Sequence, residues 1–204
     1  LGDVYKRQVY TIPVGSLPEL KYPSSTRKPY SLITASRLAS EKHVDWICKA
    51  VIQARSEVPE LSLDIYGEGG EKSKLETIIR ENNASGYIHL MGQHDLSEVY
   101  QNYEAYIAGS TSEGFGLTLM EAVGGGLPIV GFDVRYGNPT FIRNGENGYL
   151  IPLPEEDKDR IEALRKGIVD LFKQDLEHCH SVSYLVAKDF LTSSVQEKWR
   201  EAVC

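Results

Sequence analysis

The chain alternates short, almost wholly apolar runs with longer amphipathic ones, and this alternation limits its fold more than any other feature. The apolar runs of strand length lie at residues 30–36, 61–66, 87–91, 105–108 and 127–132. The amphipathic runs have helical spacing and lie at residues 43–57, 74–83, 96–102 and 117–123. Strands that are apolar throughout are typical of a parallel sheet covered on both faces. The sequence therefore predicts an α/β fold, a Rossmann-like parallel sheet with helices on both sides.

Length and local composition predict one large domain with additions at both ends. The chain has 204 residues, and we expect residues 9–180 to form the Rossmann-like domain. Residues 1–8 (L-G-D-V-Y-K-R-Q) resemble the translation of a sequencing adapter, so we exclude them from the fold. A short strand is expected at residues 9–15, and its abrupt start suggests that a preceding domain has been cut away. Residues 155–173 and about 181–202 are expected to be helices, with 181–204 packing back on the fold.

Charge and cysteine content narrow the class of protein. The net charge of −7 argues against a general nucleic-acid or membrane-surface binder. The cysteines are Cys48, Cys179 and Cys204, an odd number without paired spacing, which favours idle thiols in a reducing compartment. No run approaches the ~20 apolar residues of a membrane span, and no signal peptide precedes the first expected strand. We expect a cytoplasmic protein, with peripheral attachment at the inner face of the cell membrane left open.

Two segments have metal-ligand residue types but the wrong placement for a metal site. His178, Cys179 and His180 are adjacent, and adjacent side chains on a helix point in different directions. Asp157 and Asp159 form a D-x-D pattern, but they lie at the charged start of an expected helix and not after a buried strand. The sequence therefore predicts no metal site.

The segment from Ser112 to Pro128 (S-E-G-F-G-L-T-L-M-E-A-V-G-G-G-L-P) has the strongest functional pattern. Gly114 and Gly116 allow a tight turn, and the helix expected after them would point its N-terminal N–H groups at an anion. Glu113 and Glu121 suit sugar hydroxyls better than phosphates, because carboxylates accept hydrogen bonds. The pattern indicates a nucleotide-sugar, while an ordinary glycine-rich turn with solvated glutamates stays the alternative.

Arg37 and Lys42 could supply the positive charge that such a ligand needs. Arg37 follows an expected buried strand and Lys42 precedes the next helix, so both should lie at the sheet edge near Gly114. At about 4 Å and an effective dielectric near 20, each cation–phosphate pair is worth about 4 kcal/mol before desolvation. These cations and a helix N-terminus could neutralise a departing diphosphate without a metal. The alternative is a solvated loop in which Arg37 pairs with Glu41.

In this order, Arg37 with Lys42, the Gly67–Gly69 loop and Glu113-Gly114-Phe115-Gly116 leading to Glu121 resemble a known family. They are similar to the C-terminal, donor-binding domain of family 4 retaining glycosyltransferases of the two-domain GT-B type. Residues 132–142 (F-D-V-R-Y-G-N-P-T-F-I) resemble a Gram-positive branch that contains the accessory-Sec glycosyltransferases. These enzymes attach N-acetylglucosamine to serine-rich repeat adhesins, and closely similar enzymes glycosylate wall teichoic acid.

The resemblance implies a role for each matching residue. Arg37 and Lys42 would hold the diphosphate, and Glu113 would act at the donor sugar as the third catalytic residue. Glu121 would accept hydrogen bonds from the ribose. The remaining donor-binding positions are expected to act largely through their backbones: Gly92 and Gln93 at the uracil, Gly114, Phe115 and Gly116 at the sugar, and Leu117 and Thr118 at the phosphates.

The resemblance also implies a reaction and its partners. We expect a UDP-sugar-dependent hexosyltransferase that needs no metal or cofactor and works by charge stabilisation and orientation. Covalent catalysis by Glu113 is the minority interpretation. The acceptor is a protein or polymer, a related stabilising subunit is the expected partner, and no nucleic acid is expected. The open alternatives are a teichoic acid glycosyltransferase, a nucleotide-sugar epimerase or sugar-phosphate synthase, and a non-catalytic partner subunit.

Overall fold

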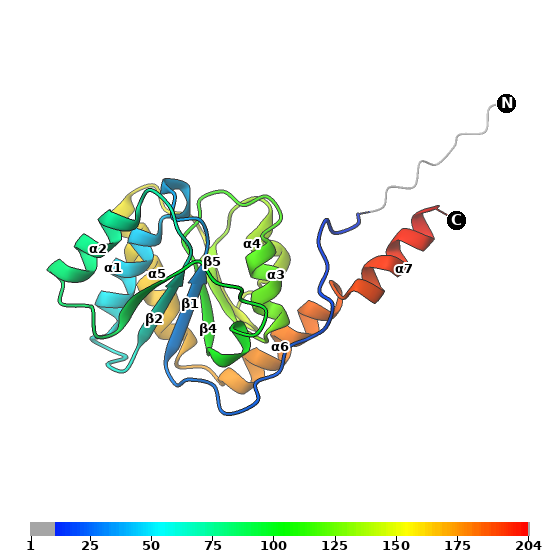
Figure 1. Cartoon of the computed structure of the whole chain (residues 1–204), viewed down its shortest axis with the longest axis horizontal. Coiled ribbons are helices and arrows are strands. Elements are labelled where there is room, and N and C mark those ends of the chain that lie inside the picture. Colours follow the sequence, from blue (N-terminus) through cyan, green and yellow to red (C-terminus); the bar gives the residue numbers. More distant parts are fainter. Residues whose placement is uncertain (1–10, 204) are drawn as a thin grey trace.

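Residues 11–203 are described by a computed structural model, and they form a six-stranded parallel sheet with helices on both faces (Figure 1). The strand order is β3-β2-β1-β4-β5-β6. The strands are β1 (Ser31–Ala35), β2 (Ser62–Tyr66), β3 (Ile88–Gly92), β4 (Ala105–Ala108), β5 (Ile129–Phe132) and β6 (Gly148–Ile151). The predicted fold class is confirmed, because β1, β4 and β5 are buried along their whole length, as apolar strands between two helical layers must be.

The helices divide between the two faces of the sheet. They are α1 (Val44–Ala54), α2 (Lys72–Glu81), α3 (Leu117–Gly124), α4 (Gly137–Phe141), α5 (Asp157–Leu171), α6 (Leu176–Lys188) and α7 (Thr192–Val203). Figure 1 shows α1, α2 and α5 on one face, while α3, α4 and α6 lie on the other. The expected apolar face of α1, formed by Val44, Ile47, Val51 and Ala54, is buried. Each face therefore has its own hydrophobic core.

Several expected elements differ from the observed ones. The helix predicted for residues 96–102 is only the 3₁₀ turn η2 (Tyr100–Asn102), and residues 11–15 of the predicted first strand form no strand. Residues 1–10, which include the proposed adapter segment and the start of that strand, lie outside the described residues. The loop at residues 21–29 is anchored, because the buried Arg27 guanidinium donates to the carbonyl groups of Gln101, Tyr103 and Gly125.

The single helix expected at about 181–202 is wrong, because the chain breaks between α6 and α7. Leu17 pairs with the backbone at the break: its N–H donates to the Phe190 carbonyl at 2.7 Å, and its carbonyl accepts from the Thr192 N–H at 2.8 Å. Helix α6 packs against α3, whereas α7 extends away from the sheet (Figure 1) and Val195 is its buried residue. That residues 181–204 pack back on the fold as a separate element stays a prediction.

Candidate functional site

The loops that leave the carboxyl ends of β1, β2, β3 and β4 meet at one edge of the sheet and form a groove of three adjoining hollows. The Lys42 hollow is lined by Ser36, Arg37, Lys42, Glu113, Gly116 and Thr118. The His94 hollow is lined by Arg37, Tyr66, Gly67, Gln93, His94 and Thr118. The Glu121 hollow is lined by Asp95, Leu96, Tyr100, Gln101, Glu121 and Gly124. The first two share Arg37 and Thr118, and Leu96 also lines the second and third. The groove therefore suits an elongated ligand.

Close backbone contact holds the β1 and β2 loops together at this edge. Gly67 has φ +133°, and a Cβ atom there would lie 1.9 Å from the Ser36 carbonyl oxygen. Only glycine fits this position without moving the loop that carries Arg37. The resemblance to a Gly-x-Gly loop thus has a steric cause in the structure.

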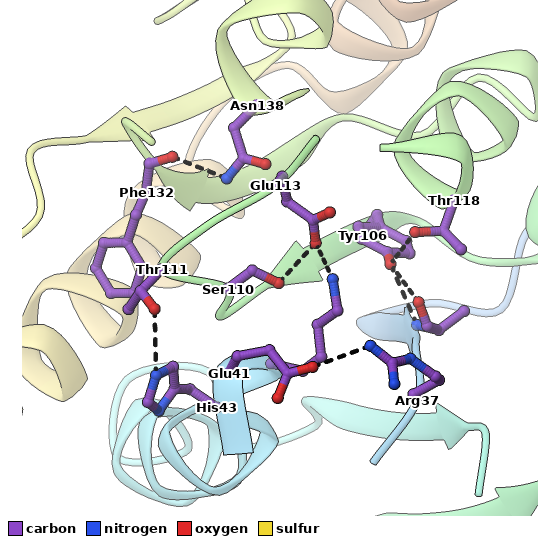
Figure 2. A network of polar contacts seen from close by, with 12 residues as sticks. Arg37, Glu41, His43, Tyr106, Ser110, Thr111, Glu113, Thr118, Phe132 and Asn138 are labelled. Carbon is purple, nitrogen blue, oxygen red and sulfur yellow. Dashed lines mark hydrogen bonds and ion pairs between the residues drawn. The ribbon is translucent and has the colours of Figure 1, made fainter. Parts of the chain in front are cut away.

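Lys42, Glu113 and Ser110 form the central polar cluster of the Lys42 hollow. The Lys42 ammonium donates to Glu113 Oε1 at 2.5 Å, and the Ser110 hydroxyl donates to the same oxygen at 2.8 Å (Figure 2). Both charged side chains are largely buried, with 18% and 17% of their surface exposed. Two donors on one carboxylate oxygen fix its orientation. Lys42, expected near the Gly114 turn, thus contacts the residue directly before it, and the contribution of Ser110 was not anticipated.

Arg37 has a different environment from Lys42. Its side chain is 79% exposed and donates to Glu41 at 3.0 Å (Figure 2), the surface pair that the sequence offered as an alternative. It still lines the Lys42 hollow, so both cations face the same space. An exposed guanidinium with one weak partner can turn toward an anion at little cost.

The N-terminus of α3 lies on the opposite wall of the Lys42 hollow. Gly116 precedes the helix in the left-handed region, with φ +85°. Residues 117–120 are uncharged, and the amides of Leu117 and Thr118 have no earlier helical carbonyl to bond. A helix start with open amides facing two cations makes a site for an anion.

Phe115 lines this hollow, and its ring also packs in the core. The ring packs edge-on against Phe141 and also contacts Phe190, so it anchors the loop in the core between α3, α4 and α6. Gly114 and Leu117 are exposed next to it.

Glu121 lies in α3, one turn after Thr118, and lines the Glu121 hollow. Glu113 lies before the helix and lines the Lys42 hollow. The Tyr100 hydroxyl donates to Glu121 Oε2 at 3.0 Å. Surrounding protein atoms exclude water from the carboxylate and raise the pKa of Glu121 above its ordinary value, against the opposing effect of the Tyr100 bond. The two glutamates therefore line opposite ends of the groove, as an extended ligand requires.

The predicted base-reading positions lie at the end of β3. Gly92 has φ +75°, and its carbonyl accepts from the Gly67 N–H at 2.8 Å. Gln93 and His94 follow it along the wall of the His94 hollow, where the His94 ring meets the Tyr66 ring edge-on. His94 Nε2 bonds the Met91 carbonyl at 2.8 Å, which fixes the loop. At these positions the Gly92 carbonyl already accepts a hydrogen bond from Gly67, and the polar residues Gln93 and His94 line the hollow.

The two segments with metal-ligand residue types make ordinary contacts with the rest of the fold. Cys179 and His180 are buried, and His180 Nε2 bonds the Glu104 carbonyl at 3.0 Å. Asp157 pairs with Arg160 at 2.8 Å at the start of α5. Within residues 11–203, no three His, Cys, Asp or Glu side chains lie close enough to hold a metal ion. Across the same residues, no helix is both long and apolar enough to cross a membrane.

The sequence of residues 20–185, which contains this site, matches the family model described as glycosyl transferases group 1. The chain belongs to this family of glycosyltransferases. The domain that contains this site is therefore a glycosyltransferase domain, the class that the sequence indicated.

Among similar proteins, the GtfA subunit of the UDP-N-acetylglucosamine–peptide N-acetylglucosaminyltransferase of Limosilactobacillus reuteri subsp. suis is 55% identical over 201 residues. The match covers 97% of this chain and 39% of that relative. The crystal structure of the pneumococcal O-GlcNAc transferase GtfA in complex with UDP and GlcNAc aligns with a TM-score of 0.91 and 54% identity, over 95% of this chain and 39% of that one. A GtfA/B complex aligns with a TM-score of 0.88 and 55% identity, over 94% and 39%.

Proposed function

We propose that the chain is the donor-binding part of a retaining glycosyltransferase that transfers N-acetylglucosamine from UDP-N-acetylglucosamine to Ser or Thr of a serine-rich repeat protein. The chain spans about two fifths of the length of the relatives it matches, so the activity of the whole protein is inferred from them. The names of these relatives give UDP-N-acetylglucosamine as the donor and a peptide as the acceptor. The identity of 55% supports the same chemistry here.

The observation that carries this proposal is the convergence of Lys42, Arg37 and the α3 N-terminus on one hollow with Glu113 in its wall. In this arrangement the diphosphate lies against Lys42, Arg37 and the amides of Leu117 and Thr118. The sugar extends toward Glu113, Gly114, Phe115 and Gly116. The ribose reaches Glu121, and the uracil reaches Gly92 and Gln93. Each role uses a donor or acceptor of the right kind at the wall of the same groove.

The reaction needs charge stabilisation and orientation. As the bond from the anomeric carbon to the diphosphate oxygen breaks, negative charge grows on the leaving group, where Lys42, Arg37 and the α3 amides stabilise it. The acceptor hydroxyl bonds to the same face of the sugar and passes its proton to the departing diphosphate. Glu113 Oε1 already accepts two hydrogen bonds, which weakens it as a covalent nucleophile and leaves Oε2 for a sugar hydroxyl.

We further propose that no metal ion is needed, because the cations and helix amides supply the positive charge that a metal would otherwise provide. The acceptor and a related stabilising subunit would bind outside this chain, and the similar GtfA/B complex supports such a partner.

The free, buried thiols of Cys48 and Cys179 fit a reducing compartment, and we propose a cytoplasmic enzyme at the inner face of the cell membrane. Cys204 lies outside the described residues.

Radiolabelled transfer by the full-length protein tests this function. The protein, with its partner subunit, should label a serine-rich peptide from UDP-N-acetylglucosamine and leave poly(ribitol phosphate) and poly(glycerol phosphate) unlabelled. Lys42→Ala and Arg37→Ala should nearly abolish labelling. Labelling of the teichoic acid polymers alone would identify that alternative substrate, and wild-type turnover by either variant would refute the diphosphate assignment.

A further inference from the structure

Tyr106 is a buried polar residue in the middle of an apolar strand, β4, directly behind the groove. Its side chain is 3% exposed. The hydroxyl donates to the Ala35 carbonyl at 2.9 Å, accepts from the Ala35 N–H at 3.3 Å, and lies 3.1 Å from Thr118 Oγ1 (Figure 2). Burial raises the pKa of the Tyr106 phenol to about 12, so it stays a neutral hydrogen-bond donor. A hydroxyl in such a position must have its bonds satisfied.

The hydroxyl connects two elements that form opposite walls of the Lys42 hollow. Ala35 ends β1, and the loop after it carries Arg37 and Lys42. Thr118 lies in the first turn of α3 and lines the same hollow together with Leu117. The spacing of these walls determines whether the cations and the amides can reach one ligand together.

Counting protons shows that Tyr106 also controls the Thr118 hydroxyl. A phenol has one hydrogen, so when Tyr106 donates to Ala35, its 3.1 Å contact with Thr118 is a hydrogen bond only if the Thr118 hydroxyl donates. When Tyr106 instead donates to Thr118, it can still accept from the Ala35 N–H, and Thr118 is free to donate outward. A phosphate oxygen can only accept, so an anion in the hollow favours the second arrangement.

We propose that Tyr106 is a positioning residue for the diphosphate of the donor, acting through Thr118 and the end of β1. The inference rests on the proposed function, which supplies a nucleoside diphosphate as the ligand. Tyr106 does not touch that ligand: it sets the separation of the two walls and turns the Thr118 hydroxyl toward the phosphates.

Titration of UDP and uridine into the 204-residue chain tests this role, because only UDP reports on the phosphates. Tyr106→Phe removes one oxygen and creates no large cavity. It should weaken UDP binding about fivefold, as the loss of one neutral hydrogen bond does, and leave uridine binding unchanged. Thr118→Val should weaken UDP binding to a similar extent, and the double variant should be no weaker than the single ones by more than about twofold.

Tyr184→Phe is the matched control. The Tyr184 hydroxyl can donate its one hydrogen to the Lys21 carbonyl at 2.8 Å or to the Gly125 carbonyl at 3.2 Å, and it accepts from Arg27. None of these partners lines the Lys42 hollow. It should lower thermal stability without changing the ratio of UDP to uridine affinity. Unchanged UDP binding in folded Tyr106→Phe, or equal weakening of UDP and uridine, would overturn the positioning role.

The wild-type chain separates this inference from the proposed function. If it binds UDP no more tightly than uridine, the phosphate site itself is wrong and both proposals fall. If it prefers UDP and Tyr106→Phe keeps that preference, only the Tyr106 inference falls. Should Tyr106→Phe not fold, Thr118→Val removes the same contact from the groove side, and unchanged UDP binding there counts against the inference.

Discussion

Replacing Lys42 or Arg37 by methionine should weaken UDP binding to a similar extent, but only the Lys42 substitution should clearly lower the stability of the fold. Lys42→Met removes the ammonium from a pair that is 2.5 Å long and largely buried, and leaves the Glu113 carboxylate with Ser110 alone. Arg37→Met removes a guanidinium that is 79% exposed and paired only at the surface with Glu41. Methionine keeps the length and apolar stem of both side chains.

The expected effects on stability follow from burial. Breaking a fully buried pair costs about 3–5 kcal/mol, and the remaining solvent contact of Lys42 and Glu113 reduces this to about 2 kcal/mol. For a chain of this size, that lowers the midpoint of thermal unfolding by about 4–8 °C. An exposed pair between residues four positions apart contributes little, so Arg37→Met should leave the midpoint within about 2 °C of the parent.

The expected effects on ligand binding are similar for both variants. A cation about 4 Å from a phosphate is worth about 4 kcal/mol before desolvation, and roughly a third of this should remain as net binding energy. UDP affinity should fall about tenfold in each variant, measured by calorimetry, while uridine affinity stays constant. Circular dichroism during heating gives the unfolding midpoints of the same samples.

Two results would refute this reasoning. Equal destabilisation by Arg37→Met and Lys42→Met would mean that their burial does not differ as described. Unchanged UDP affinity in Lys42→Met would mean that the Lys42–Glu113 pair is only structural. Glu113→Gln provides the control for the pair: it should also destabilise the chain, because Lys42 then loses its charged partner.

Three further predictions concern Glu121, Gly116 and metal ions. Because the folded chain raises the pKa of Glu121, it loses stability as pH rises through that pKa. Glu121→Gln should therefore resist urea better than the parent at about pH 7 but not at about pH 3.5, while its UDP affinity falls. Gly116→Ala should cost about 1–2 kcal/mol in urea unfolding, because φ is +85° and a Cβ would lie 2.8 Å from Leu119 Cδ1. A chelator should leave UDP affinity and full-length transfer unchanged, and activity restored only by manganese or magnesium would contradict metal independence.

The fold could be predicted where local and tertiary preferences agree. The runs that became β1, β4 and β5 are apolar enough that only a two-sided sheet can bury them. The break between α6 and α7 could not be predicted, because its backbone hydrogen-bond partner, Leu17, lies far away in the sequence. The burial of Arg27 has a similar origin, since its carbonyl acceptors belong to η2, the segment after it and the end of α3.

The candidate site could be predicted as far as its charged residues and glycines. Arg37, Lys42, Glu113 and the turn before α3 have local patterns that indicate an anion and a sugar. The residues that orient them lack such patterns. Ser110 and Tyr106 look like ordinary loop and strand residues, and their roles depend on partners that folding brings close. The separation of Glu121 from Glu113 along the groove also follows from helix geometry, not from their residue types.

A crystal structure of the 204-residue chain with UDP tests the central claim most directly. The account predicts the diphosphate in the Lys42 hollow, with phosphate oxygens within hydrogen-bond distance of Lys42 Nζ and of the Leu117 or Thr118 amide, and with the ribose at Glu121. A phosphate that binds outside this hollow, or a nucleotide whose ribose lies away from Glu121, would contradict it.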